Sequence, residues 1–154
     1  MDRKRSRRRS RTHDPMSQSC KLDEAEVEQW KVASEAGEKF STLYYCAFDK
    51  PNRPDLPGFF MDNVVLIWNG NRVETQPSVV EFLNKLPRCT TNLHSLSAQP
   101  VHKSVSGERL LILVNTLGTI KFEQHPVRLF SETFFLTQDN SLWRVQSVTF
   151  RFMD

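Results

Sequence analysis

The alternation of hydrophobic and polar residues predicts a long helix, a tight hairpin and a second helix. Apolar positions in residues 22–48 recur every three or four residues, as in an amphipathic helix. These positions are Val27, Trp30, Ala33, Gly37, Phe40, Tyr44 and Ala47. Residues 64–68 are a β-branched and aromatic run that ends at an Asn-Gly dipeptide, which favours a type I′ turn. Residues 77–86 return to helical spacing, and Pro87 ends that helix.

The remaining segments predict an irregular bridge and a set of strands. Residues 49–58 contain three prolines and a glycine, with one turn of helix expected near residues 56–60. Beyond Pro87 the pattern changes to long strands separated by short connections. The expected strands are residues 92–104, 109–122, 127–137 and 142–153. Four successive strands with short connections predict an antiparallel meander.

The predicted strands carry apolar residues on both faces. In residues 110–122 both the odd and the even positions hold leucine, isoleucine or valine. An antiparallel sheet with one face in water alternates more cleanly than this. We therefore expect an α+β fold in which three helices cover one face of a curved antiparallel sheet. The other face is predicted to need cover from a second molecule, as in a dimer.

Positive charge is concentrated at the N-terminus. Residues 1–15 hold seven Lys and Arg residues against two Asp, whereas the rest of the chain holds 14 basic and 16 acidic residues. We expect residues 1–15 to be a disordered basic Arg/Ser tail and residues 22–154 to form the folded domain. The tail is compatible with a nuclear localisation signal, a weak RNA contact, phosphorylation at Ser6 and Ser10, or a passive extension.

Composition excludes several classes of protein. The three cysteines are widely spaced, without a CxxC pair, and predict reduced thiols rather than disulfides or a metal site. The longest apolar stretch, residues 110–114, is far shorter than a membrane span, so we expect a soluble protein. No motif for a cofactor is present in the sequence, and none is predicted.

Five short strings resemble one known family. The order of elements resembles the cone-shaped nuclear transport factor 2 superfamily over residues 22–154. The strings LIWNGN, EFLNKLP, AQPVH, GTIKF and FRF are similar to the export-related branch of that superfamily. They begin at Leu66, Glu81, Ala98, Gly118 and Phe150. Some departures from the branch are visible, including Val148 where an acidic residue is common.

The resemblance implies a function and a partner. Members of that branch pair with the similar domain of the large messenger-RNA export receptor, and the complex passes nuclear pores by binding phenylalanine-glycine nucleoporins. The resemblance therefore implies a non-enzymatic adaptor that shuttles between nucleus and cytoplasm through the nuclear envelope. It also implies that Arg151 is the interface arginine, which pairs with an acid of the larger subunit. Counted with a period of two, Arg151 shares its face with four further candidate interface residues. They are Trp143, Val145, Thr149 and Met153.

Two alternatives stay open within the same superfamily. A homodimeric carrier of Ran-GDP would need acids around the mouth of the cone, and no convincing set is visible. An isomerase or dehydratase would need an acid or base inside the cone. The first strand ends Leu66-Ile67-Trp68-Asn69 and offers none, while Asp49 and Asp62 are expected in loops. We expect no catalytic residue and no acid or base in the pocket, and Tyr44, Tyr45 and the four histidines are expected to have structural roles.

Overall fold

The computed structural model describes residues 23–154. The predictions for residues 1–15, including Ser6 and Ser10, lie outside the described residues. Helix α1 (Glu24–Asp49) begins with a capping box. The side chain of Asp23 accepts from the amide of Glu26, and the Glu26 carboxylate accepts from the amide of Asp23. The predicted long helix is confirmed.

The hairpin and second helix follow the sequence pattern closely. A short 3₁₀ helix, η1 (Leu56–Phe59), leads into β1 (Phe60–Trp68), β2 (Asn71–Glu74) and α2 (Gln76–Asn84). Asn69 and Gly70 join the two strands with φ angles of 46° and 87°. Both angles are positive, as a type I′ turn requires.

Four long strands complete one six-stranded sheet in the order β2-β1-β6-β5-β4-β3. They are β3 (Cys89–Pro100), β4 (Leu111–Phe122), β5 (Arg128–Asp139) and β6 (Leu142–Phe152). The meander β3-β4-β5-β6 is antiparallel, as predicted. Strand β1 pairs with β6 in parallel, which sequence periodicity did not predict.

The predicted third strand ends early. We expected residues 92–104 to be extended, but β3 stops at Pro100 and a short helix, α3 (Lys103–Ser106), follows. The side chain of His102 accepts a hydrogen bond from the amide of Ser104 and caps this turn. A local side-chain bond of this kind competes with extended structure, which explains the difference.

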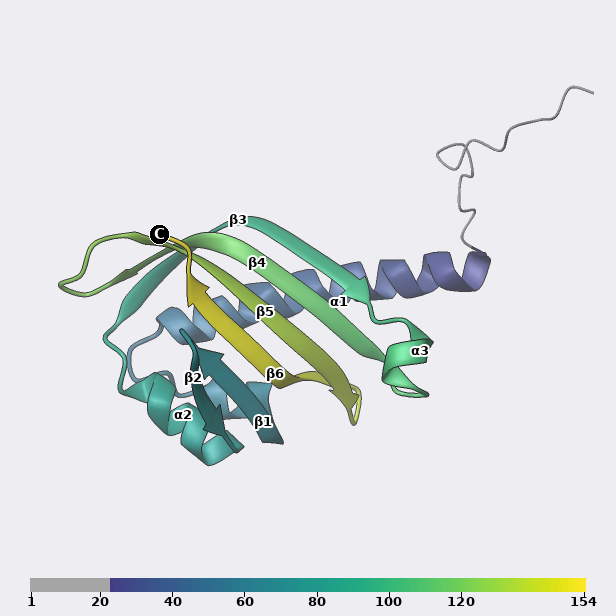
Figure 1. Ribbon diagram of the computed structural model, residues 1–154, viewed down its shortest axis with the longest axis horizontal. Coiled ribbons are helices and arrows are strands. Elements are labelled where there is room, and N and C mark those ends of the chain that lie inside the picture. Colours follow the sequence, from purple (N-terminus) through teal and green to yellow (C-terminus); the bar gives the residue numbers. More distant parts are fainter. Residues whose placement is uncertain (1–22) are drawn as a thin grey trace, which may run out of the picture.

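Helix α1 lies against one face of the curved sheet, and none of the helices in the described part of the chain lies over the other face (Figure 1). The core between them is rich in aromatic rings. Tyr44 of α1 packs against Phe134 of β5 with ring centroids 5.0 Å apart. Trp68 stacks on Phe150 at 3.8 Å, which joins the end of β1 to the end of β6. Within residues 23–154 no helix is both long enough and apolar enough to cross a membrane.

Candidate functional site

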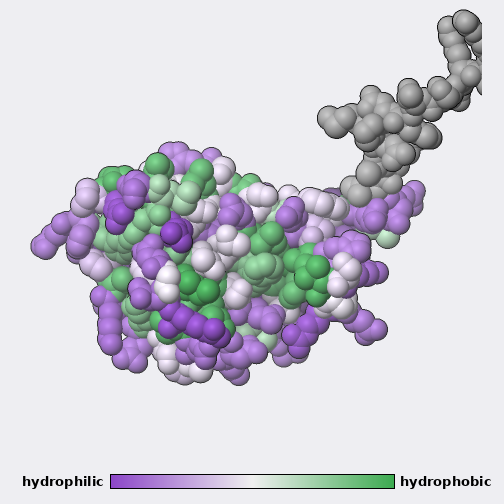
Figure 2. Space-filling model, in the orientation of Figure 1, coloured by the Kyte–Doolittle hydropathy of each residue, from purple (hydrophilic) through white to green (hydrophobic). Residues whose placement is uncertain are grey.

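The outer face of the sheet, meaning the side chains that point away from α1, carries exposed apolar groups. Burial alternates along β4, so that the even-numbered residues, including Ile112, Val114 and Ile120, are in the core and the odd-numbered residues between them point outward. Large apolar side chains of β1, β4 and β5 on the outer face remain 37–45% exposed. They are Ile67, Leu117, Leu129 and Phe135. The predicted second apolar face is present, and its apolar patches alternate with hydrophilic ones (Figure 2).

Short polar side chains separate the apolar groups on this face. Asn115 of β4 donates a 2.8 Å hydrogen bond to the hydroxyl of Thr133 on β5. Ser131 of β5 is opposite Arg151 of β6, and Ser147 of β6 is opposite Phe135 of β5. Such a mixed surface is typical of protein interfaces, whose composition resembles the ordinary protein surface more than a core.

Arg151 lies on the outer face near the end of β6. It is opposite Ser131 in the register of β5 and β6, and its side chain is exposed. No carboxylate of residues 23–154 forms an ion pair with its guanidinium. An arginine on a partly apolar surface offers a fork of donors that fits a carboxylate of another molecule.

Thr149 and Met153 accompany Arg151 on the outer face, but Trp143 and Val145 do not. Val145 is fully buried, and Trp143 packs against the core. The prediction that these two residues share the face of Arg151 was wrong. The register of β5 and β6 shifts between Phe135 and Leu136, leaving an extra residue on β6. A β-bulge of one residue moves all earlier side chains to the opposite face, and periodicity alone cannot show it.

A buried carboxyl group lies inside the cone, which the sequence analysis did not expect. Glu132 of β5 is only 3% exposed. The hydroxyl of Tyr45 donates a 2.7 Å hydrogen bond to Oε1 of Glu132, and Thr116 lies 2.7 Å from the same hydroxyl. A signal was available, because Glu132 alternates with the core residues Phe130 and Phe134 along β5.

Burial determines the protonation state of Glu132. Loss of hydration raises the pKa of this carboxyl to about 8, and the hydrogen bond from Tyr45 offsets only part of the effect. Burial likewise raises the pKa of Tyr45 well above its ordinary value. Glu132 is therefore a neutral acid at neutral pH, held among aromatic rings. Among residues 23–154 it lines none of the three cavities found at the surface.

A second polar cluster joins the C-terminal end of α1 to β3. The carboxylate of Asp49 accepts bonds from the amide and hydroxyl of Thr91, each within 3.0 Å. The thiol of Cys89 lies beside this carboxylate, and burial raises the pKa of the thiol to about 12. This cysteine is a neutral, unreactive group. No group of histidine, cysteine and acidic side chains in residues 23–154 has the geometry of a metal site.

Two surface grooves flank the core. The first, the α1 groove, has a volume of about 600 Å³ between α1, η1 and the turn from β5 to β6. Its apolar lining comes from Val32, Ala36, Phe40, Leu43, Phe59 and Trp143. The second, the sheet-end groove, has a volume of about 420 Å³. Its lining includes Trp68, Phe122, His125, Arg128 and Phe152.

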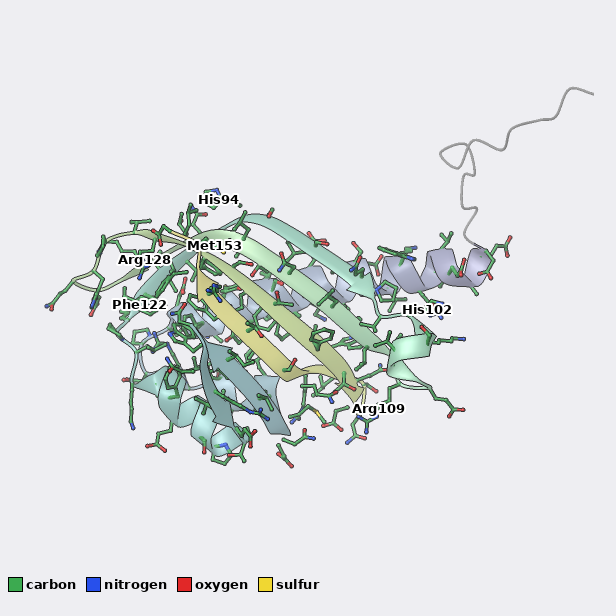
Figure 3. All side chains as sticks on the ribbon, in the orientation of Figure 1. His94, His102, Arg109, Phe122, Arg128 and Met153 are labelled. Carbon is green, nitrogen blue, oxygen red and sulfur yellow. The ribbon has the colours of Figure 1, made fainter. Side chains whose placement is uncertain are left out.

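Arg128 dominates the rim of the sheet-end groove. Its guanidinium lies 3.8 Å from the ring centroid of Phe152 and forms a 3.1 Å ion pair with Asp154. Phe122, Arg128 and Met153 gather at this end of the sheet, whereas His102 and Arg109 lie at the opposite end (Figure 3). The lining of this groove is thus largely aromatic, and the charge of Arg128 is paired with Asp154.

The sequence of this chain matches a known family. Residues 36–152 fit the family model of the nuclear transport factor 2 (NTF2) domain. The chain belongs to the NTF2 domain family. The NTF2-related export protein 1 of Bos taurus is 36% identical over 126 residues, which cover 79% of this chain and 89% of that protein. The NTF2-related export protein 2 of Homo sapiens is 35% identical over 126 residues, covering 79% and 88%.

Solved structures share the fold of this NTF2 domain. A chain of the C. albicans Mtr2–Mex67 M domain complex aligns with a TM-score of 0.63 and 10% identity. The alignment covers 79% of this chain and 96% of that chain. The resemblance inferred from the five strings is therefore confirmed, and so is the cone-shaped α+β fold.

The other candidate residues of this NTF2 domain have structural surroundings. His94, His102 and His125 are exposed, and they lie in β3, after β3 and between β4 and β5, respectively. Tyr44 is buried among aromatic rings such as that of Phe134. The carboxylate of Asp49 accepts a hydrogen bond from the amide of Thr91 in β3. Asp62 is exposed in β1. The outer face of the sheet is thus the candidate site of protein size that residues 23–154 present.

Proposed function

We propose that this protein is a nuclear export adaptor that forms a heterodimer with the NTF2-like domain of the large messenger-RNA export receptor. The outer face of the sheet is the surface that the two subunits share in this proposal. The adaptor has no catalytic function of its own. It shuttles between nucleus and cytoplasm and supports passage of the complex through nuclear pores, including contact with phenylalanine-glycine nucleoporins.

The observation that carries this proposal is the composition of the outer face around Arg151. Leu117, Leu129 and Phe135 are 37–45% exposed and would lose this remaining contact with water on association. Complete transfer of such a side chain from water contributes about 1.5–3 kcal/mol, so each would contribute roughly half of that or less. Arg151 supplies a cation that forms no ion pair with any carboxylate of residues 23–154. The face therefore favours a partner that presents apolar side chains and a carboxylate.

The relatives support the same assignment. Both curated relatives described above carry the name NTF2-related export protein. The solved complex of Mtr2 with the M domain of Mex67 contains a chain with the fold of this domain. We assign the export role of these relatives to this chain because of its similarity to them and because of the composition of its outer face.

An enzymatic role is less well supported. Catalysis would require a substrate to reach the carboxyl group of Glu132. The α1 groove and the sheet-end groove are lined by other residues, and the rings of Phe130 and Phe134 occupy the core on either side of Glu132. A packed acid of this kind contributes to the pH dependence of stability instead.

The Ran-GDP alternative needs acids at the mouth of the cone. The described lining of the sheet-end groove contains His125 and Arg128 but no Asp or Glu, and the one adjacent carboxylate, that of Asp154, is already paired with Arg128. The groove therefore offers no set of acids for a basic loop of a GTPase. A pull-down with GDP-loaded Ran separates the two roles, because only a Ran carrier retains the GTPase.

Native mass measurement tests the heterodimer directly. The chain is measured alone and after co-expression with the NTF2-like domain of the large export receptor. We expect a one-to-one complex that survives purification. Two separate species after co-expression would contradict the proposal, and a stable complex with Ran-GDP instead would replace it with the carrier role.

In this proposal the basic tail, residues 1–15, makes at most a weak contact with RNA. Deletion of residues 1–15 is expected to lower RNA affinity and to flatten its dependence on salt, because neutralised phosphates release counterions. An RNA affinity that is the same with and without the tail would show that the tail has another role.

A further inference from the structure

Asn69 holds the backbone of β6 on both sides of Arg151. Its amide donates a 2.9 Å hydrogen bond to the carbonyl oxygen of Phe150. Its side-chain oxygen Oδ1 accepts a 2.9 Å hydrogen bond from the amide of Phe152. Phe150 and Phe152 are the two neighbours of Arg151 in the chain. These two hydrogen bonds, which we call the Asn69 bridge, therefore fix the peptide groups that flank the arginine.

The Asn69 bridge continues the parallel ladder of β1 and β6, which lie side by side (Figure 1). The last pair of this ladder is Trp68 and Phe150, so the next position along both strands places Asn69 beside Arg151. In a parallel ladder, the amide and the carbonyl oxygen of one residue bond to the two residues that flank its partner. At Asn69 the side-chain oxygen takes the place of the carbonyl oxygen.

The hairpin turn explains why this position needs a side chain with an acceptor. Asn69 has a φ of 46° because it is the first residue of the turn into β2. Strand β2 lies on the far side of β1 from β6, so the chain leaves the ladder at this residue. Asparagine tolerates a positive φ and also carries an acceptor oxygen. Glycine would meet the first requirement but not the second.

Strand β5 holds the other side of β6 at the same level. Arg151 is opposite Ser131 in the antiparallel register, and the amide of Met153 donates to the carbonyl oxygen of Leu129. Hydrogen-bonded pairs alternate along an antiparallel ladder, so the backbone of Arg151 itself bonds toward β5. The peptide groups of its two neighbours face Asn69 instead. Without the side chain of Asn69, the last amide of β6 would lose its partner.

Aromatic contacts fix the same two neighbours on the inner face of the sheet. The ring of Phe150 stacks on Trp68 at 3.8 Å, and the guanidinium of Arg128 lies 3.8 Å from the ring centroid of Phe152. Because side chains alternate along a strand, these contacts direct Arg151 to the outer face. Ends of strands commonly fray. The backbone beneath Arg151 is held nevertheless, although β6 ends at the next residue.

We propose that Asn69 is a positioning residue for Arg151, which presents its guanidinium to a carboxylate of the partner subunit. Asn69 has this role only if the proposed heterodimer forms, because it acts through Arg151 and needs no contact with the partner. Pairing of a guanidinium with a carboxylate through two hydrogen bonds requires a defined position and direction. A backbone that is already fixed in the free chain loses less conformational freedom on association, which raises the affinity.

Hydrogen exchange in the free chain tests the Asn69 bridge. Asn69→Gly removes the acceptor and keeps the turn, because glycine adopts a positive φ readily. Exchange of the Phe152 amide, followed by NMR, should become at least about fivefold faster in this variant. Asn69→Asp keeps an acceptor oxygen and should keep the slow rate. Asn71→Gly is the matched control, since it makes the same change in β2, which does not adjoin β6.

A double-mutant cycle on the complex separates positioning from general stability. Calorimetry with the NTF2-like domain of the large subunit should give at least about fivefold weaker binding for Asn69→Gly than for the native chain. Asn71→Gly should bind like the native chain. Asn69→Gly added to Arg151→Ala should weaken binding by less than about twofold further, because the residue through which it acts is already missing. A general weakening of the fold would lower affinity equally in both backgrounds.

Failure of the positioning role and failure of the heterodimer would give different results. The positioning role would be overturned if Asn69→Gly left the exchange of the Phe152 amide or the affinity unchanged, or if it weakened binding equally with and without Arg151. The native complex would still form in each of these cases. A native chain that does not bind the domain would overturn the proposed function, and the role of Asn69 with it.

Discussion

The guanidinium of Arg53 donates a 2.7 Å hydrogen bond to the carbonyl oxygen of Leu83, thirty residues away in the chain. Further bonds reach the carbonyl oxygens of Phe48, Leu86 and Pro87. Arg53 is only 4% exposed, and its charge lies where the carbonyl ends of α1 and α2 meet. Helix C-termini attract cations, so one side chain satisfies the ends of two helices.

Replacement of this arginine should strongly destabilise the domain. Arg53→Met is expected to lower the free energy of unfolding by about 3–5 kcal/mol, because four carbonyl groups lose their donor in a buried place. Urea unfolding followed by circular dichroism measures the change. The exposed Arg72→Met is the control and should change stability by less than about 0.5 kcal/mol. Equal stability of the two variants would contradict the role of Arg53.

Stability should fall as pH rises through neutrality because of Glu132. Its pKa is raised from 4.5 to about 8 in the folded chain. Below pH 4.5 the carboxyl is protonated in both the folded and the unfolded chain, so it does not lower the free energy of unfolding. Between these values the folded state holds a proton that the unfolded state lacks, so stability decreases with rising pH and levels off above about pH 8.

The variant Glu132→Gln isolates this contribution. The amide keeps an oxygen that accepts from Tyr45 and cannot ionise. Relative to Glu132→Gln, the native chain should lose on the order of 3–5 kcal/mol between pH 4.5 and pH 9. Urea titrations at several pH values measure this difference. The exposed Glu123→Gln should keep the native slope, and a parallel pH profile for Glu132→Gln would disprove the assignment.

Gly37 should resist replacement despite its position inside a helix. Alanine has a helix propensity about 1 kcal/mol more favourable than glycine. A Cβ at Gly37 would overlap Ala98, so Gly37→Ala is expected to be net destabilising by about 1–3 kcal/mol. Thermal unfolding measures the change. Gly58→Ala serves as control, since no atom lies within 4 Å of the added Cβ; a stabilised Gly37→Ala would show that the layers separate easily.

Arg151→Asp should abolish the proposed heterodimer while leaving the fold intact. Arg151 is exposed in the isolated chain, so the substitution costs the domain little. Across the interface it would place an acid opposite an acid, at an expected cost of about 2–5 kcal/mol of binding free energy. Co-purification and calorimetry with the large subunit's domain measure the loss. Arg109→Asp, at the far end of the sheet, makes the same charge change and should bind normally.

Local patterns were sufficient for most elements of the fold. The stripe of α1, the Asn69-Gly70 turn and the helix before Pro87 each depend on contacts between residues close in the chain. The apolar outer face could also be predicted, because both parities of β4 hold apolar residues. Arg151 itself was placed on that face correctly. Its role there stays a prediction.

Other features depended on contacts between distant segments. The parallel pairing of β1 with β6 joins strands far apart in sequence. The bulge at residue 146 turned Trp143 and Val145 into the core, although a strict period of two assigns them to the face of Arg151. The hydrogen bond between Tyr45 and Glu132 spans 87 positions of the chain, and only folding makes that carboxyl a buried acid.

By itself, the sequence determined the helices, the turns, the meander and the surplus of apolar positions, because periodicity and turn chemistry act over a few residues. Tertiary structure decided which face each side chain occupies, which acid is buried and where α1 extends past β3. These properties follow from register and from the crossing of a helix over a sheet. A single inserted residue in a strand moves its side chains to the opposite face of the sheet. The path of α1 over the sheet depends on how closely Gly37 and Ala98 approach.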